Sequence, residues 1–484
     1  MFHRRDGCLT RGVAARSIRA GLAVALLAGA AVLAGLTAAS EAPAFASHTT
    51  ARAPGRALPE PVPFFQLPVP VGAGGIPAAR SGPPPTSAQC LASIGVNCYW
   101  PYQIRAAYGM GQLYANHETG KGETIVIVDS FGSPTIGHDL AAFDSAFKIP
   151  GPPELRIIAP AGKIPAYYPN PARVGWAEET TLDVEWSHAM APGARILLVE
   201  TPINETIGTT GFPQMIKAEN YVVSHKLGNV ISQSFGAPEQ TFPSANSIES
   251  LRSAYKAAAR AGVSVLAAAG DEGASGPANA AGTKYFTRRV VSWPASDPLV
   301  TAVGGTELRL NSKGQRIAPD VVWNDTAAEG APAATGGGVS SVFARPRYQD
   351  ALKAVVGAHR GIPDISLSAS ISGAVLIYAS FPGGPGGWQP IAGTSEATPL
   401  LAGIVAIADQ VAGHGLGLLN PTLYRLGAGS KALVDITSGN NSVFFTESGT
   451  KHEVVGYRAT KGFDLASGNG TPYAPALVAA LAKG

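Results

Sequence analysis

Short apolar runs alternate with segments of helical periodicity along the middle of the chain, and this alternation limits the possible folds most. Residues 123–129 are β-branched and apolar on both faces, which is typical of a buried parallel strand. Similar patterns predict strands at 194–200, 229–234 and 262–269, and helices at 138–147, 176–190 and 244–261. Strands and helices that alternate in this way build a parallel sheet with helices on both faces. The sequence therefore predicts an α/β fold with a mainly parallel central sheet.

The composition favours a globular chain with a large core. Of the 484 residues, 45% are hydrophobic and only 14% are charged, against about 25% charged in an average soluble protein. This balance excludes a disordered chain. We expect one large domain over residues 89–484.

The N-terminus has the order of parts of a secretory signal. A start with five arginines precedes an apolar run at 21–36, and residues 44–46 have a small-x-small pattern. This predicts a signal peptide over 1–46, cleavage after Ala46 and an extracellular protein. The alternative is a retained membrane anchor, although the run is shorter than the roughly 20 residues of a span. Residues 47–88 are rich in Pro, Ala and Gly, which predicts an extended linker or short pro-segment.

The charge of the chain argues against one class of binding partner. The chain has 36 basic and 33 acidic residues, and loss of the signal's five arginines and two acids would leave equal numbers. Such a balance argues against a nucleic-acid partner.

Cys8 lies in the signal, so Cys90 and Cys98 remain as an even pair. In an exported protein this predicts a disulfide, with free thiols as the alternative.

A serine nucleophile is suggested by the string Gly-Thr-Ser-Glu-Ala-Thr-Pro at 393–399. It precedes an apolar helix that runs to about Ala412, so Ser395 would lie at a helix N-terminus. Free N–H groups and the helix dipole favour developing negative charge there. Gly393 allows a sharp turn, and Pro399 falls in the first turn, where its missing N–H costs little.

The base for this serine is either a histidine or a carboxylate. A serine–histidine–aspartate triad needs a histidine ordered by an aspartate, and Asp129 ends a strand as such an aspartate would. The candidates His138 and His188 lack the following glycine of such a segment, so we interpret them as surface or packing residues. Glu179 and Asp183 instead lie four apart on one helical face. Two acids at that spacing repel, which raises one pKa and suits Glu179 to act as a base at acidic pH.

A third acid, Asp271, follows the strand predicted at 262–269. The carboxyl ends of parallel strands are where α/β sheets hold their sites. A protonated Asp271 could donate a hydrogen bond to an oxyanion. The alternative is a turn aspartate before glycine.

Together these motifs resemble the sedolisin family, the serine-carboxyl peptidases. The order Glu-x-x-x-Asp, Gly-Asp-x-Gly and Gly-Thr-Ser-x-x-x-Pro is that of the family, and residues 232–236, 303–306, 336–343 and 360–364 match it too. The resemblance covers roughly residues 95–484 and implies a subtilisin-like fold. It also implies that Glu179 is the base, Asp183 its orienting acid, Asp271 the oxyanion donor and Ser395 the nucleophile.

The resemblance further implies one structural calcium ion near the C-terminus. The ligands would be the carboxylates of Asp435 and Asp464 and the carbonyl oxygens of Ile436, Thr460 and Gly462, which are oxygen ligands of the kind that calcium prefers. The alternative is a pair of turn aspartates.

Two features depart from the family. Members are usually made with a long folded propeptide, whereas only residues 47–88 separate the predicted signal from the catalytic pattern. Glu396 also follows the nucleophile where a small residue is common. It could lie near the substrate or serve as a first-turn acid.

The main hypothesis is an acid-active secreted endopeptidase, monomeric, with polypeptide substrates and without stable membrane association. One alternative is a non-catalytic relative that binds peptides or cell-wall material. Another is a hydrolase of small esters or amides.

Overall fold

The computed structural model describes residues 67–68 and 82–484, all of them in one compact unit. The predicted signal peptide (1–46) and most of the predicted linker (47–88) lie outside the described residues. Across the part of the chain that is described, no helix has the length and apolarity needed to cross a membrane.

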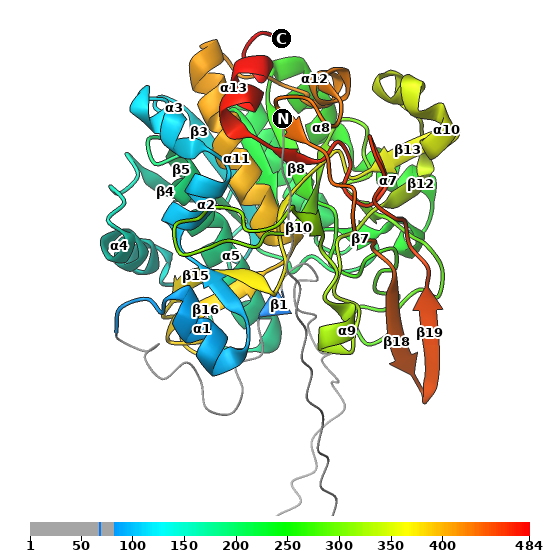
Figure 1. The fold of residues 1–484 in the computed structure, drawn as a ribbon, viewed down its shortest axis with the longest axis horizontal. Coiled ribbons are helices and arrows are strands. Elements are labelled where there is room, and N and C mark those ends of the chain that lie inside the picture. The colour runs from blue at the N-terminus through cyan, green and yellow to red at the C-terminus, as the bar shows by residue number, and fades with distance from the viewer. Residues whose placement is uncertain (1–66, 69–81) are drawn as a thin grey trace, which may run out of the picture. The chain divides into compact units, whose positions relative to one another are not determined.

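An eight-stranded sheet forms the centre of the fold (Figure 1). Seven strands follow the order β11-β10-β8-β6-β3-β5-β4, and β14 also pairs with β10. Every neighbouring pair is parallel except β10 with β11. The strands are β3 (Thr124–Ser130), β4 (Leu155–Ile158), β5 (Arg195–Thr201), β6 (Val230–Gln233), β8 (Ser264–Ala268), β10 (Thr301–Glu307), β11 (Val321–Val322) and β14 (Ile365–Ser368).

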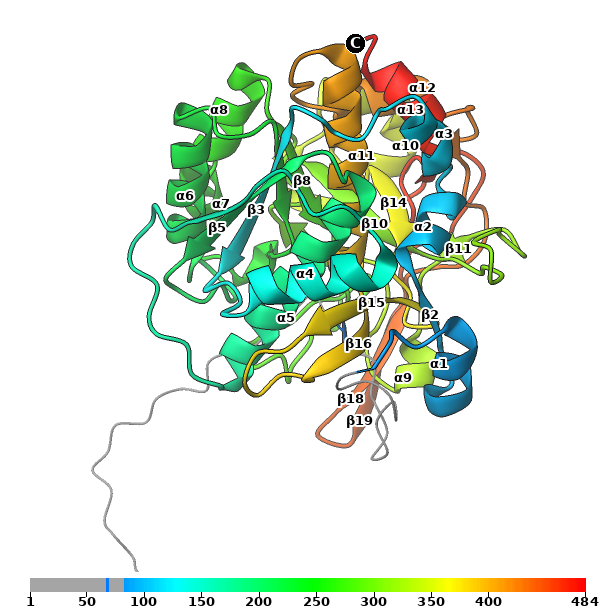
Figure 2. The ribbon, with the colours of Figure 1, turned by 90° about the vertical axis from the view of Figure 1, so that its left-hand side faces the viewer.

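The two faces of this sheet carry separate apolar cores. Successive side chains of a strand point to opposite faces. In β3, Ile125 and Ile127 therefore join one core while Val126 and Val128 join the other. The first core is covered by α4 (Ile136–Phe147), α5 (Pro171–Met190), α11 (Thr394–Ala412) and α13 (Ala474–Leu481), and the second by α6 (Phe212–Ser224) and α8 (Ser253–Ala261). Figure 2 shows α6 and α8 on one side of the sheet and α11 on the other. The predicted fold class is confirmed.

Two of the predicted helices differ from the structure by more than a shift of one or two residues at an end. Helix α5 begins at Pro171 rather than at 176, because Asn170 caps it by accepting a hydrogen bond from Arg173 N and Pro171 suits the first helical position. The single helix predicted at 244–261 is wrong. It is broken into α7 (Ala245–Ser250) and α8, with a tight turn at Leu251 and the guanidinium of Arg252 held by Asp297.

A second, four-stranded sheet has the order β1-β16-β15-β2. Its strands are β1 (Leu67–Pro68), β2 (Asn97–Tyr99), β15 (Gly373–Ala379) and β16 (Gly387–Ala392). The short β1 lies within the predicted linker and pairs antiparallel with the end of β16, with Leu67 opposite Ala392. The remaining elements are α1 (Ser87–Ile94), α2 (Pro101–Ala107), α3 (Met110–Ala115), α9 (Thr326–Glu329), α10 (Lys353–Val356), α12 (Asn420–Leu426) and the pairs β7 (Ala237–Pro238) with β9 (Ser292–Trp293), β12 (Gly338–Ala344) with β13 (His359–Ile362), β17 (Leu433–Val434) with β20 (Thr471–Pro472), and β18 (Val443–Glu447) with β19 (Thr450–Val454).

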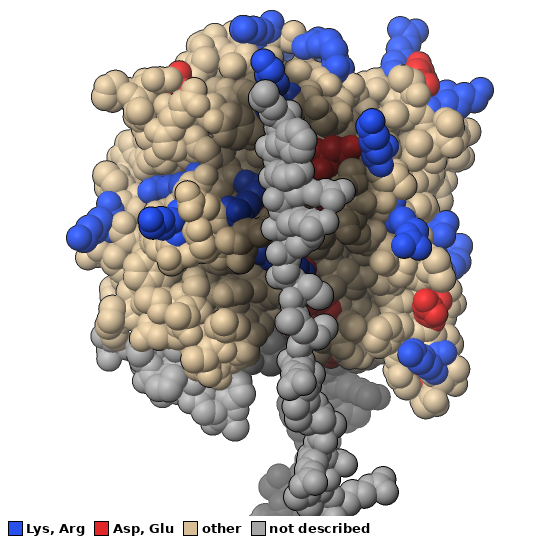
Figure 3. All heavy atoms as spheres, viewed as in Figure 1, with Lys and Arg blue, Asp and Glu red and all other residues tan. Residues whose placement is uncertain are grey.

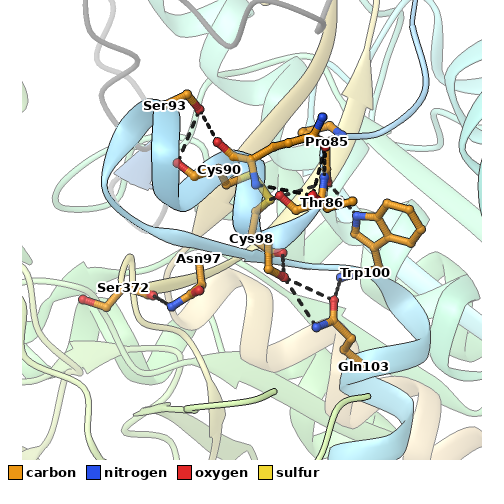
Figure 4. The surroundings of a disulfide bond; sticks show 11 residues. Pro85, Thr86, Cys90, Ser93, Asn97, Cys98, Trp100, Gln103 and Ser372 are labelled. Carbon is orange, nitrogen blue, oxygen red and sulfur yellow. Dashed lines mark hydrogen bonds between the residues drawn. A yellow bond between two sulfur atoms is a disulfide. The ribbon is translucent and has the colours of Figure 1, made fainter. Parts of the chain in front are cut away.

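The predicted disulfide joins Cys90 in α1 to Cys98 in β2, with 5.9 Å between the two Cα atoms (Figure 4). Both residues are buried. Ser87 Oγ donates a hydrogen bond to Cys98 O at 2.6 Å, and Trp100 Nε1 donates one to Pro85 O at 2.6 Å. The bridge and these bonds hold α1 against β2.

Candidate functional site

Helix α5 presents two acids to the interior. Glu179 and Asp183 are both fully buried, as is nearly every residue from Ala172 to Met190, because the helix is covered by α11 and β3. Asp183 Oδ1 accepts a hydrogen bond from Ser234 Oγ at 2.9 Å, while its other oxygen has no partner. The buried setting expected for this pair is therefore present.

The Glu179 carboxyl lies beside Ser395. Burial raises the pKa of Glu179 well above its usual value, and the nearby charges of Asp183 and Asp129 raise it further. The Ser395 hydroxyl acts in the opposite direction and lowers this pKa, which indicates that the two side chains are near each other. Neither the Glu179 oxygens nor Ser395 Oγ has a hydrogen bond of full geometry with a described group. The arrangement leaves an alcohol next to an acid that can take its proton.

Ser395 is the second residue of α11 and follows the end of β16 by three positions. Gly393 turns the chain between the two elements at φ 127°, a region that only glycine adopts without strain. Gly393 is the N-cap and has no side chain to cap the helix. The first N–H of the helix, that of Thr394, donates to Asp271 Oδ1 at 2.8 Å, and that of Glu396 donates to Gly393 O at 2.9 Å. Ser395 therefore lies at a helix N-terminus as expected, with the neighbouring N–H groups of Thr394 and Glu396 already bonded.

Asp271 is tied directly to the residue before this serine. Its Oδ1 accepts hydrogen bonds from Thr394 N at 2.8 Å and from Thr394 Oγ1 at 2.7 Å, and Gly270 N donates to Thr394 Oγ1 at 3.1 Å. The second oxygen, Oδ2, is buried without a partner. Burial raises the pKa of Asp271 well above its usual value, and the charge of Glu272 adds to this effect. A protonated Asp271 is thus favoured.

The structure adds two residues to the site, Asp129, which the sequence offered only as the aspartate of a histidine triad, and Ser234. Asp129 is buried at the end of β3, and burial raises its pKa to about 7. Its charge also raises the pKa of both Glu179 and Asp183. Ser234 follows β6, beside β3 in the sheet, and bonds Asp183. Their position at the carboxyl ends of buried strands was the available signal.

The two candidate histidines lie elsewhere. His138 has a side chain that is 67% exposed, and its partners are Asp139 and Ser380. His188 is buried and faces Pro150 O and Asp144. A histidine base for Ser395 finds no support in these contacts.

Glu396 points away from solvent. It is fully buried in the first turn of α11, and neither carboxylate oxygen has a hydrogen-bond partner of full geometry. Burial raises its pKa well above the usual value, with the Ser368 hydroxyl acting in the opposite direction. It is therefore a first-turn acid, as considered from the sequence, but a buried one.

The residues expected to bind calcium lie together near the C-terminus. Asp435 Oδ2 accepts a hydrogen bond from Gly462 N at 2.9 Å, and Asp464 Oδ2 accepts one from Thr460 N at 2.9 Å. Asp464 Oδ1 is held by the N–H groups of Ala466 and Ser467. Within residues 82–484 no group of three or more His, Cys, Asp or Glu side chains could hold a metal.

Comparison with known proteins links this geometry to a family. Residues 174–425 match the model of the subtilase family. Kumamolisin of Bacillus sp. (strain MN-32) is 32% identical over 399 residues, which cover 80% of this chain and 64% of kumamolisin. Human tripeptidyl-peptidase 1 is 32% identical over 269 residues, covering 53% of this chain and 43% of that protein. The chain thus spans less than two thirds of the length of these relatives.

A solved structure agrees with the sequence relatives. Pseudomonas sedolisin, a serine-carboxyl proteinase in complex with pseudo-iodotyrostatin, superposes with a TM-score of 0.66 at 27% identity, over 79% of this chain and 98% of that one. The chain belongs to the subtilase family and, within it, to the sedolisins, the serine-carboxyl peptidases with a subtilisin-like fold.

Proposed function

We propose that this protein is a secreted serine-type endopeptidase that hydrolyses peptide bonds through an acyl-enzyme on Ser395. The observation that carries the proposal is the approach of the Ser395 hydroxyl to the buried Glu179 carboxyl, which lowers the raised pKa of that acid. Family membership supports the same reaction class.

In the proposed reaction, Ser395 Oγ attacks the carbonyl carbon of the scissile bond while its proton passes to Glu179. The C=O electron pair moves to oxygen, and a protonated Asp271 donates a hydrogen bond to that oxyanion. Glu179 then gives the proton to the leaving amine, the C–N bond breaks, and an ester remains on Ser395. Water hydrolyses the ester with Glu179 again acting as base.

Asp183 orients Glu179 in this scheme. It is held by Ser234 on one side and lies one helical turn from Glu179 on the other. Its own pKa is raised well above the usual value, first by burial and then by Asp129. Neighbouring acids of this kind share protons, so the cluster works best where some of them remain protonated.

We propose activity on the acid side of neutrality for the same reason. The oxyanion donor must keep its proton, so turnover falls as the pH rises through the pKa of Asp271. That pKa lies well above the ordinary aspartate value because the side chain is buried. The alkaline limb of the pH profile is therefore assigned to Asp271.

A structural calcium ion is also proposed, at the residues that the resemblance to the family assigns to it. The Gly462–Asp435 hydrogen bond joins the loops that carry Asp435 and Asp464. Both oxygens of Asp464 accept backbone N–H groups, which the ion would displace. Two carboxylates with the carbonyl oxygens of Ile436, Thr460 and Gly462 would give an oxygen-rich site. The ion would neutralise the two acids and fix the loops.

Polypeptide substrates, a monomeric state and the absence of a nucleic-acid partner belong to the same proposal. On the face shown in Figure 3, Lys and Arg side chains are spread among uncharged residues rather than gathered in one patch. This distribution does not favour a polyanion, which needs clustered positive charge. Gel filtration of the purified chain tests the monomeric state.

The test is hydrolysis of a denatured protein substrate from about pH 2.5 to pH 8, to find where the base and acid are both competent. Ser395→Ala should abolish turnover, and Ser93→Ala, at an exposed serine of α1, should not. Internal cuts in the substrate, read by mass spectrometry, separate endopeptidase action from removal of tripeptides. Activity that survives in Ser395→Ala would place the nucleophile elsewhere. A folded chain without activity at any pH would favour a peptide-binding relative.

A further inference from the structure

A groove of about 550 Å³ lies beside α4, and Ser395 is not among the residues that line it. Its walls are Leu140, Ala141 and Asp144 from α4 and Gly151, Pro152 and Leu155 from the chain that leads into β4. Figure 2 shows α4 at the surface, in front of α5. Apart from the glycines, the side chains that line it are apolar, with one exception, the carboxylate of Asp144.

Asp144 supplies that carboxylate. The residue is only 6% exposed, and Oδ1 lies 3.2 Å from His188 Nε2 without an ordinary hydrogen bond, because the imidazole also faces Pro150 O at 3.0 Å. The Oδ2 atom has no hydrogen-bond or ion-pair partner among the described residues. A Cβ at Gly151 would lie 3.8 Å from this oxygen, so the glycine leaves its groove side uncovered.

The charges around this carboxylate are mainly negative. Glu185 of α5 is buried, and its Oε1 has no partner. Its pKa is raised well above the usual value by burial and then by the charges of Asp139 and Asp144 on α4. No described Lys or Arg lies within ion-pair distance of Asp144. Among the residues that the structure describes, His188 is the only basic group that faces it.

His188 also separates the groove from the catalytic acids. It follows Glu179 by nine positions on α5, which at 100° per residue places the two side chains on opposite faces of the helix. The groove therefore lies behind the helix that carries the catalytic acids.

We propose that this groove binds the side chain of a lysine in a polypeptide. The apolar walls suit the methylene stem, and the Oδ2 atom of Asp144 suits the ammonium group. Because Oδ1 already faces His188, one oxygen remains, which fits a point-like ammonium better than the two-pronged guanidinium of arginine. The site goes beyond peptide-bond cleavage and would give a substrate a second contact away from Ser395.

Calorimetry with a small ligand tests the site without using activity. The probes are Nα-acetyl-lysine N-methylamide and its norleucine counterpart, which keeps the stem but lacks the ammonium. The lysine probe should bind at least about tenfold more tightly than the norleucine probe. Asp144→Asn should remove this difference, and Glu154→Gln, at an exposed acid nearby, should leave it unchanged.

A second variant covers the case in which Asp144→Asn weakens the fold. Gly137 lines the groove in α4, and a Cβ there would meet no atom within 4 Å, so Gly137→Leu has room in the helix and would occupy the groove. Its affinity for the lysine probe should fall at least about tenfold while circular dichroism shows an unchanged fold. Equal binding of both probes, or lysine binding that persists in a folded Asp144→Asn or Gly137→Leu variant, would overturn the proposal.

Discussion

Asp271 Oδ1 accepts two hydrogen bonds from Thr394, one from its backbone N–H and one from its hydroxyl. One oxygen of the carboxyl is thereby used as an acceptor only. The other oxygen is buried and unpartnered, and it is the atom on which a proton can remain. The two hydrogen bonds from Thr394 thus fix the position of Asp271 beside the proposed nucleophile. They also leave Oδ2 as the oxygen that can carry the proton.

Because of these two hydrogen bonds, Asp271→Asn is an informative variant. An asparagine keeps the acceptor oxygen for Thr394 and presents N–H where the proton is expected. This variant should retain substantial turnover, and its alkaline limb should move to higher pH because no carboxyl remains to titrate. Asp271→Ala should reduce kcat by about 10²–10³, the usual cost of losing an oxyanion donor. The measurement is kcat against pH, and an asparagine variant as inactive as the alanine variant would contradict the role of proton donor.

Glu179→Gln should remove the base while preserving the shape of the site. We expect a loss in kcat of at least about 10³, because general-base catalysis contributes about 10²–10⁴. Glu178→Gln is the matched control, since it makes the same chemical change one position earlier on α5. Both variants should fold, as circular dichroism can check. Comparable losses of kcat in the two variants would contradict the role of Glu179 as the base.

Buried acids should make the fold less stable as the pH rises. Burial raises the pKa of Glu219 and of Asp409 to about 8 in each case, far above the values of an unfolded chain. The folded state therefore holds protons that the unfolded state has released. Their contribution to the free energy of unfolding is complete below about pH 4 and is lost as the pH rises toward about 8. Tm measured from acid to neutral pH should fall steadily.

Glu219→Gln isolates one of these groups. The amide cannot ionise, so the variant should gain on the order of 3–5 kcal/mol over the unchanged chain near pH 8 and little near pH 4. Glu249→Gln is the control, because ion pairs with Lys256 and Arg252 lower the pKa of this acid. A Tm profile unaltered by Glu219→Gln would show that this carboxyl does not limit stability.

Removal of calcium should lower Tm. A ligand that binds only the folded state at 100 times its Kd contributes about 2.7 kcal/mol, which excess chelator would withdraw. Asp435→Asn and Asp464→Asn should start with the lower Tm and respond little to chelator. Asp350→Asn, at an exposed acid, should respond as the unchanged chain does. An identical Tm with and without chelator would contradict the proposed calcium site.

The Cys90–Cys98 bridge should stabilise the N-terminal part of the domain. It closes a loop with a sequence separation of 8, and loops of this size contribute about 2–3 kcal/mol when closed. Cys90→Ser with Cys98→Ser should lower Tm and make it insensitive to reductant. If reductant lowers the Tm of this double variant further, another reducible bond is present.

Four strands of the central sheet, β3, β5, β6 and β8, were predictable because they are short and mainly apolar on both faces. The limits of α5 were harder to predict, since the cap at Asn170 and the start at Pro171 precede the apolar pattern. The break between α7 and α8 depends on Asp297, far along the chain, which holds Arg252. Local periodicity carries no information about such a partner.

The candidate site was predictable where one helix or turn holds the signal. The spacing of Glu179 and Asp183 implied a shared face, and Gly393 implied a turn before Ser395. The contribution of Asp129 and Ser234 depended on the strand order, which brings β3 and β6 together. The complete burial of Glu396 could not be deduced either, because a first-turn acid is usually solvated.

The order of elements along the chain has a consequence for biosynthesis. The acids proposed for catalysis reside on α5 and after β8, whereas Ser395 arrives on α11, after every strand of the central sheet has been made. A nascent or truncated polypeptide that ends before α11 carries the acids without the alcohol. Such fragments lack the proposed nucleophile, so the proposed peptide-bond hydrolysis could begin only when translation is almost finished.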